Sequence, residues 1–95
     1  MSSKRFLMIS IDPEVTFDLG VLERELDKAA DWVQFFPHSW LVFTGRTSKT
    51  WYRRIQTVVG ERRRIFVCAV DVNSRGGYMP RPFWDFLARN GGPED

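Results

Sequence analysis

Two segments with the apolar spacing of a helix each lie between segments with the spacing of a strand, and this order constrains the fold most. In residues 5–11 successive side chains alternate between two faces, and this period of two predicts a strand. Pro13 lacks a ladder donor, so this strand is expected to end beside it. Three further strands are predicted, over residues 32–36, 39–44 and 64–72. The short Pro37-His38 connection predicts that the second and third strands form a hairpin.

The helical segments follow the first and third strands. The first is expected to begin near Thr16 or Asp18, and its buried stripe is predicted to contain Leu19, Leu22, Leu26, Ala29, Ala30 and Val33. In the second, Thr47 or Ser48 can cap the first turn and Gly60 can end the helix. Its predicted apolar stripe is Trp51, Ile55, Val58 and Val59. A short apolar helix is predicted over residues 83–87, after a flexible loop that contains Gly76-Gly77.

This order of elements predicts an α+β fold, the ferredoxin-like βαββαβ sandwich, with two helices on one face of a four-stranded antiparallel sheet. Ninety-five residues make a single domain, 1–95, with an ordered core of about 4–89 and a polar, frayed tail to Asp95. The strand over 64–72 is apolar on both faces, which predicts a central strand covered on both sides.

The chain carries more large apolar side chains than a domain of this size easily hides, with four Trp and eight Phe. The sheet face opposite the two helices is expected to be uncovered and apolar. A homodimer would cover it, with about 800 Å² buried per partner. The predicted dimer interface consists of Phe6, Met8, Phe66, Val70, Phe83 and Trp84. The two aromatic residues of the C-terminal helix are expected to pack on the neighbouring copy.

Basic residues cluster around the second helix although the formal net charge is only +2. Guanidinium groups bind phosphates of any sequence, which favours contact with the backbone of DNA or RNA. The predicted nucleic-acid-binding residues are Arg46, Lys49, Arg53, Arg54, Arg62, Arg63 and Arg64, with Tyr52 as a ring on which a base can stack. The alternative is a solvated charge run whose arginine stems cover neighbouring aromatic side chains.

Asp12 ends the first strand and is the candidate catalytic and metal-binding residue. A single carboxylate binds Mg²⁺ or another divalent cation poorly, so this role needs a second copy from a symmetric partner, with Glu14 as a further oxygen. The alternative is that Asp12 caps the following loop or the following helix, a common role for Asp before Pro. The chain has a single histidine, His38, and no Walker-type glycine loop, so neither a catalytic triad nor a nucleotide site is indicated.

The expected location is the cytoplasm. The single Cys68 cannot form an internal disulfide, which fits a reducing compartment. There is no secretory segment at the start and no apolar run near the roughly 20 residues that a membrane span needs.

The layout, with a carboxylate at the end of the first strand, resembles the small CRISPR-associated Cas-two family of dimeric ferredoxin-like proteins, with the related VapD-type toxins and SinR-type small proteins of bacteria. The resemblance runs over about residues 4–73 and is carried by Ile9-Ser10-Ile11-Asp12, Ser39-Trp40-Leu41-Val42 and the strand over 64–72. It differs from the family pattern in Pro13-Glu14 and Ser10 around the aspartate.

The resemblance implies that Asp12 from two subunits meets across the dimer interface and holds one metal for phosphodiester cleavage. It also implies that such a protein can be a structural subunit that binds nucleic acid. Two functions are therefore expected: a non-catalytic homodimeric module that binds nucleic-acid backbone or a protein partner, or a metal-dependent endonuclease that acts on RNA or DNA.

Overall fold

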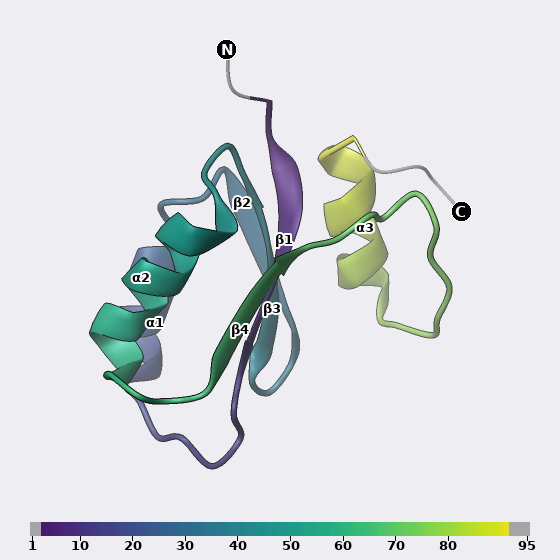
Figure 1. The fold of residues 1–95 in the computed structure, drawn as a ribbon. Coiled ribbons are helices and arrows are strands. Elements are labelled where there is room, and N and C mark those ends of the chain that lie inside the picture. The colour runs from purple at the N-terminus through teal and green to yellow at the C-terminus, as the bar shows by residue number, and fades with distance from the viewer. Residues whose placement is uncertain (1–2, 92–95) are drawn as a thin grey trace.

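A computed structural model describes residues 3–91 and shows an α+β architecture, in which a four-stranded antiparallel sheet lies between helices (Figure 1). The elements in chain order are β1 (Arg5–Ile11), α1 (Leu19–Leu26), β2 (Asp31–Phe36), β3 (Ser39–Thr44), α2 (Ser48–Val59), β4 (Ile65–Ala69) and α3 (Arg81–Arg89). The strand order β2-β3-β1-β4 is compatible with a ferredoxin-like fold. Across residues 3–91 no helix is both long and apolar enough to cross a membrane. The predicted polar tail lies outside the described residues.

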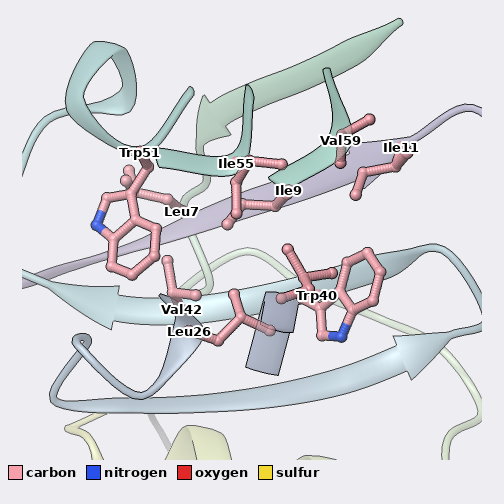
Figure 2. Packing of buried hydrophobic residues seen from close by; sticks show 10 residues of the cluster. Leu7, Ile9, Ile11, Leu26, Trp40, Val42, Trp51, Ile55 and Val59 are labelled. Carbon is pink, nitrogen blue, oxygen red and sulfur yellow. The ribbon is translucent and has the colours of Figure 1, made fainter. Parts of the chain in front are cut away.

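The main core lies between one face of the sheet and the pair α1 and α2 (Figure 2). Leu7, Ile9 and Ile11 of β1 point to this face, as alternation along a strand requires. In β3 the partners of Leu7 and Ile9 are Val42 and Trp40, which are fully buried. The predicted first strand and the hairpin that joins β2 to β3 are confirmed.

α2 forms where its capping and apolar residues predict it. The Thr47 hydroxyl accepts a hydrogen bond from the Thr50 backbone N–H at 3.1 Å, and the helix ends before Gly60, whose φ of 106° suits glycine. Trp51, the first residue of the apolar stripe, is completely buried. Its indole Nε1–H donates to the buried Thr44 hydroxyl at 3.1 Å, which ties α2 to the end of β3.

α1 is shorter than its apolar spacing predicts. Asp18 caps α1, which ends at Leu26. Leu22 and Leu26 are buried in the predicted way, but Leu19 is exposed, and Ala29, Ala30 and Val33 are not helical. Two sheet contacts explain the early end. The Ala30 backbone N–H donates to the Phe43 carbonyl at 2.9 Å, and Val33 pairs with Leu41 in the sheet. Pairing with β3 therefore competes with the helix and determines where α1 ends.

The prediction that the fourth strand is central is wrong. β4 pairs with β1 on one side and lies at the edge of the sheet. Ile65 and Val67 face the main core, but Phe66 on the opposite face is 61% exposed. Apolar residues on both faces therefore do not mean that both faces are covered here, because β4 packs against α2 on one side only.

The expectation of an uncovered second sheet face is also wrong over most of that face. α3 packs there, on the side opposite α1 and α2 (Figure 1). Phe86 and Leu87 of α3 are buried against Phe6 and Leu41, and the rings of Phe6 and Phe86 meet edge to face with centroids 5.8 Å apart. The chain thus covers its own apolar surface with a helix that was expected to pack on a neighbouring copy.

A polar anchor holds the end of α3 on β2. The guanidinium of Arg89 donates to both carboxylate oxygens of Asp31, with Nε–Oδ2 at 2.7 Å and Nη2–Oδ1 at 3.2 Å. The Asn90 amide donates to the same carboxylate at 2.7 Å. The hydrogen bond from Arg89 lowers the pKa of Asp31 and, with that from Asn90, outweighs the effect of partial burial, which raises it. The same contact raises the pKa of Arg89.

Replacing Phe86 with Ala should lower the free energy of unfolding by about 3–5 kcal/mol, because α3 loses a fully buried ring that packs on the sheet. Urea denaturation measures this loss. Tyr78→Ala is the matched control, since Tyr78 is fully exposed, and it should change the free energy by no more than about 0.5 kcal/mol. A Phe86→Ala protein as stable as the parent would show that α3 does not pack on the sheet in solution.

The anchor at Asp31 should make stability depend on pH. The pKa of Asp31 is lowered in the folded state, so its carboxylate stabilises the fold at pH values above its unfolded pKa of about 3.9. This stabilisation is lost as the pH falls from the unfolded pKa through the lower pKa of the folded state. Compared with Asp31→Asn, the parent should be more stable by about 1 kcal/mol at neutral pH, and the difference should shrink below about pH 4. Denaturation of both proteins at a series of pH values measures it.

Asp85→Asn is the control for this series, because Asp85 forms an exposed ion pair with Arg81 at 3.5 Å on the same helix. It should change the free energy of unfolding by less than about 0.5 kcal/mol throughout. A constant difference between the parent and Asp31→Asn over the whole pH range would contradict the role of the ionised carboxylate.

Candidate nucleic-acid interface

Asp12 lies between two open hollows at the end of β1, beside the turn that leads into β4. The first, of about 340 Å³, is lined by Asp12, Glu14, Val15, Arg62, Arg63 and Arg64. The second, of about 610 Å³, is lined by Ser10, Ile11, Asp12, Pro13, Tyr52, Arg63, Arg64, Ile65 and Phe66. They share Asp12, Arg63 and Arg64, so we treat them as one site and call it the arginine hollow.

The three arginines of the hollow are held by a tight turn. This turn includes Gly60 at φ 106° and Arg62 at φ 59°, a left-handed conformation that is uncommon for a residue with a side chain. The Asp12 backbone N–H then donates to the Arg64 carbonyl at 3.0 Å, which joins the turn to the end of β1. Arg62, Arg63 and Arg64 are all exposed, and none of them forms an ion pair with any residue in 3–91. Their guanidinium groups therefore remain available to an anionic ligand.

Asp12 stabilises the loop after β1 through its own atoms. Its carboxylate oxygen Oδ1 accepts the Glu14 backbone N–H at 3.0 Å, and its backbone carbonyl accepts the N–H of Val15 at the same distance. This fits the alternative in which Asp12 caps the loop, whereas the following helix α1 is capped by Asp18. Across residues 3–91 no group of three or more His, Cys, Asp or Glu side chains is placed to hold a metal ion. A catalytic metal at Asp12 stays a prediction that depends on oxygens from a second subunit.

Arg46 and Lys49 do not belong to the arginine hollow. They lie at the start of α2, whose 12 residues span about 18 Å, whereas Arg62–64 follow its other end. Arg46 lines a separate hollow of about 540 Å³ together with Lys4 and Lys28. The basic residues that the sequence groups together are therefore divided between two ends of one helix.

The remaining candidates lie along α2. Arg53 is exposed, whereas Arg54 is half-buried and its guanidinium carbon lies 5.0 Å from the centroid of the Trp51 ring. Arg54 thus fits the alternative in which an arginine covers an aromatic side chain. Tyr52 is 36% exposed and lines the hollow, and its hydroxyl accepts a hydrogen bond from the Gln56 amide at 3.3 Å.

The residues predicted for a dimer interface are in three different environments. Phe6 is 7% exposed beneath α3, while Met8, Val70, Phe83 and Trp84 are half-buried in the same cluster. Phe66 is the exception, because it is exposed and lies outside that cluster. The homodimer stays a prediction, and Phe66 is the predicted contact that a second copy could reach without displacing α3.

The proximity of Asp12 to Arg62–64 is what the sequence analysis missed. These residues are far apart in the chain and meet because β1 and β4 are paired neighbours, with Ile11 opposite Ile65. The predicted fold contained a signal for this, since an antiparallel neighbour of the first strand must begin where that strand ends.

No family model, no curated protein and no solved structure matches this chain. The resemblance to the small dimeric CRISPR-associated proteins therefore stays a prediction. The geometry of the arginine hollow is therefore the feature of this protein that indicates a function.

Proposed function

We propose that this protein is a ferredoxin-like βαββαβ module with an added C-terminal helix, and that it binds nucleic-acid backbone through the arginine hollow without catalysing a reaction. One observation carries the proposal: three consecutive arginines are exposed at one end of the sheet without an ion-pair partner in residues 3–91.

The chemistry of these side chains favours phosphate as the ligand. A guanidinium presents a planar fork of donors that matches two phosphate oxygens, and such charge-assisted hydrogen bonds are stronger than neutral ones. Consecutive arginines on a turn can reach successive phosphates without reading any base. The three arginines outnumber Asp12 and Glu14, so the hollow keeps a positive balance although the whole chain carries only +2.

The hydrogen bond of Asp12 supports a structural role for this residue. One of its carboxylate oxygens already accepts the Glu14 backbone N–H, which stabilises the shape of the loop. A carboxylate beside bound phosphate repels it, so Asp12 in this proposal limits the affinity of the hollow. The proposal therefore treats this residue as structural.

A metal-dependent endonuclease is the second candidate, and the position of Asp12 in both parts of the hollow favours it. Phosphate held by Arg63 and Arg64 would lie beside this carboxylate. In a homodimer with a second Asp12 close by, the pair would supply oxygen ligands for Mg²⁺ or another divalent cation. The two candidates share the ligand and differ in the role of one side chain.

Replacing both Arg63 and Arg64 with Gln in one protein should weaken binding of a labelled oligonucleotide by about tenfold or more, because charge-assisted contacts to phosphate are lost. The dependence of log affinity on log salt concentration should also become shallower by about 0.7–0.9 for each phosphate contact removed. Fluorescence anisotropy between about 50 and 200 mM salt measures both quantities.

Arg46→Gln is the matched control, because Arg46 is an exposed arginine that does not line the arginine hollow. It should leave both the affinity and the salt dependence close to those of the parent. Arg63→Gln and Arg64→Gln are also measured singly, so that each removes one charge as Arg46→Gln does. Equal losses from Arg46→Gln and from either single variant would show unspecific attraction to a basic surface, which contradicts the proposed site.

Asp12→Asn separates the two candidate functions. Asparagine keeps an oxygen that can accept the Glu14 N–H, so the loop should be retained while one negative charge is removed. A non-catalytic module should bind as tightly as the parent or more tightly, and neither protein should cleave RNA or DNA with Mg²⁺. Cleavage by the parent that stops in Asp12→Asn and in the presence of chelator would establish the endonuclease instead.

A further inference from the structure

One cross-strand row of the sheet lies on the face that carries α3 but outside the cluster that α3 covers. It consists of Phe36, Ser39, Ser10 and Phe66, one residue from each of β2, β3, β1 and β4. Each member pairs with the next across the sheet, and the pairing of β2 with β3 is irregular between Gln34 and Phe36. None of the four belongs to the apolar cluster beneath α3.

The two ends of this row are exposed aromatic rings. Phe36 is 57% exposed and Phe66 is 61% exposed, whereas the next row inward contains Leu41, which is 6% exposed. Three strand spacings separate β2 from β4, so the backbones that carry the two rings lie about 14 Å apart along the row. The Phe36 ring lies 5.0 Å from the ring of Phe35, which in turn meets Phe83 of α3, whereas Phe66 lies outside the cluster beneath α3. Phe66 is therefore the more open of the two rings.

The middle of the row is polar. The hydroxyls of Ser10 and Ser39 are 2.9 Å apart and share a hydrogen bond, and both residues are half-buried. A hydroxyl in such a pair keeps a further hydrogen-bonding position for a ligand that lies across the row. An apolar partner would leave that position unsatisfied, whereas sugar and base atoms can fill it.

The row is continuous with the arginine hollow. Ser10 and Phe66 line the second hollow together with Arg63 and Arg64. An exposed ring beside phosphate-binding groups is the arrangement that single-stranded nucleic acid needs, because every unpaired base offers a flat face for stacking. A duplex keeps its bases stacked on one another and offers only its phosphates here.

We infer that the ligand is single-stranded nucleic acid, with its phosphates on Arg63 and Arg64 and with unpaired bases stacked on Phe66 and Phe36 across the row. This inference rests on the proposed function and adds the class of nucleic acid that the site accepts. A second copy of this chain or another protein with an apolar surface would also cover the two rings. The adjacent arginines favour a ligand that carries both flat bases and phosphates.

The test compares the anisotropy of labelled oligo(U), oligo(dT) and a duplex of the same length at about 50 mM salt. The parent should bind both single strands more tightly than the duplex. Phe66→Ala should weaken single-strand binding roughly 5- to 100-fold and change duplex binding little. Phe66→Leu should lose as much, because leucine is apolar without a flat face, and Phe66→Trp should keep the affinity. Phe36→Ala should weaken binding in the same direction.

Tyr78→Ala is the control, since this ring is fully exposed and lies outside the row. It should bind like the parent, and urea denaturation should confirm that each Phe66 variant is folded. Oligo(dU) is measured beside oligo(U), because the two carry the same base and a difference in affinity between them then reports the preferred sugar.

Three results would overturn the inference. If Arg63 and Arg64 variants weaken binding but Phe66→Ala does not, and duplex binds as well as single strands, the proposed function stands and the stacking role fails. If Phe66→Leu binds like the parent, the contact is apolar and does not need a ring. If no nucleic acid binds and Phe66→Ala converts a dimer to a monomer in sedimentation, the row is an interface between copies, and the proposed function fails as well.

Discussion

The pairing of β1 with two antiparallel neighbours is the interaction on which the rest of the structure depends. Side chains of β1 that face α1 and α2 pack beside their β3 and β4 partners in the main core. Those that face α3 pack beside their partners on the other side of the sheet. The same pairing brings Asp12 beside Arg64 and places Ser10 between Ser39 and Phe66. A shift of one residue in this register would send every side chain of β1 to the wrong face and remove both the core and the hollow.

α3 decides which part of the second sheet face is open to a ligand. Phe86 and Leu87 cover the apolar rows, and the carboxylate of Asp31 holds the far end of the helix through Arg89. A short domain with many aromatic side chains needs such a cover, because the surface is too apolar to remain in water. α3 does not reach the row that runs from Phe36 to Phe66. The exposed end of that row at Phe66 therefore lies next to Arg63 and Arg64.

Opposite charges meet in the arginine hollow, so the two proposed functions differ in the role of a single side chain, Asp12. The guanidinium groups attract phosphate, whereas Asp12 opposes it and at the same time stabilises the loop. One carboxylate is enough for the loop but too few for a firmly held divalent cation. One chain therefore supplies groups suited to the proposed binding of phosphate, whereas the proposed metal site would need a second subunit.

The sequence by itself determined the features that depend on near neighbours along the chain. Alternation predicted β1, and the short Pro37-His38 connection predicted the hairpin of β2 and β3. A cap at Thr47 or Ser48 and the apolar stripe from Trp51 predicted α2, and the position before Pro13 predicted that Asp12 follows a strand. These features rest on local hydrogen bonds and side-chain periodicity, which a short window contains.

Only the tertiary structure decided the end of α1, the edge position of β4, the docking of α3 on its own sheet and the meeting of Asp12 with Arg62–64. Each of these depends on which distant segment supplies a hydrogen bond or an apolar contact. Local patterns show that a surface is apolar or charged. Which segment covers that surface, and which distant groups come together there, is decided only when the chain folds.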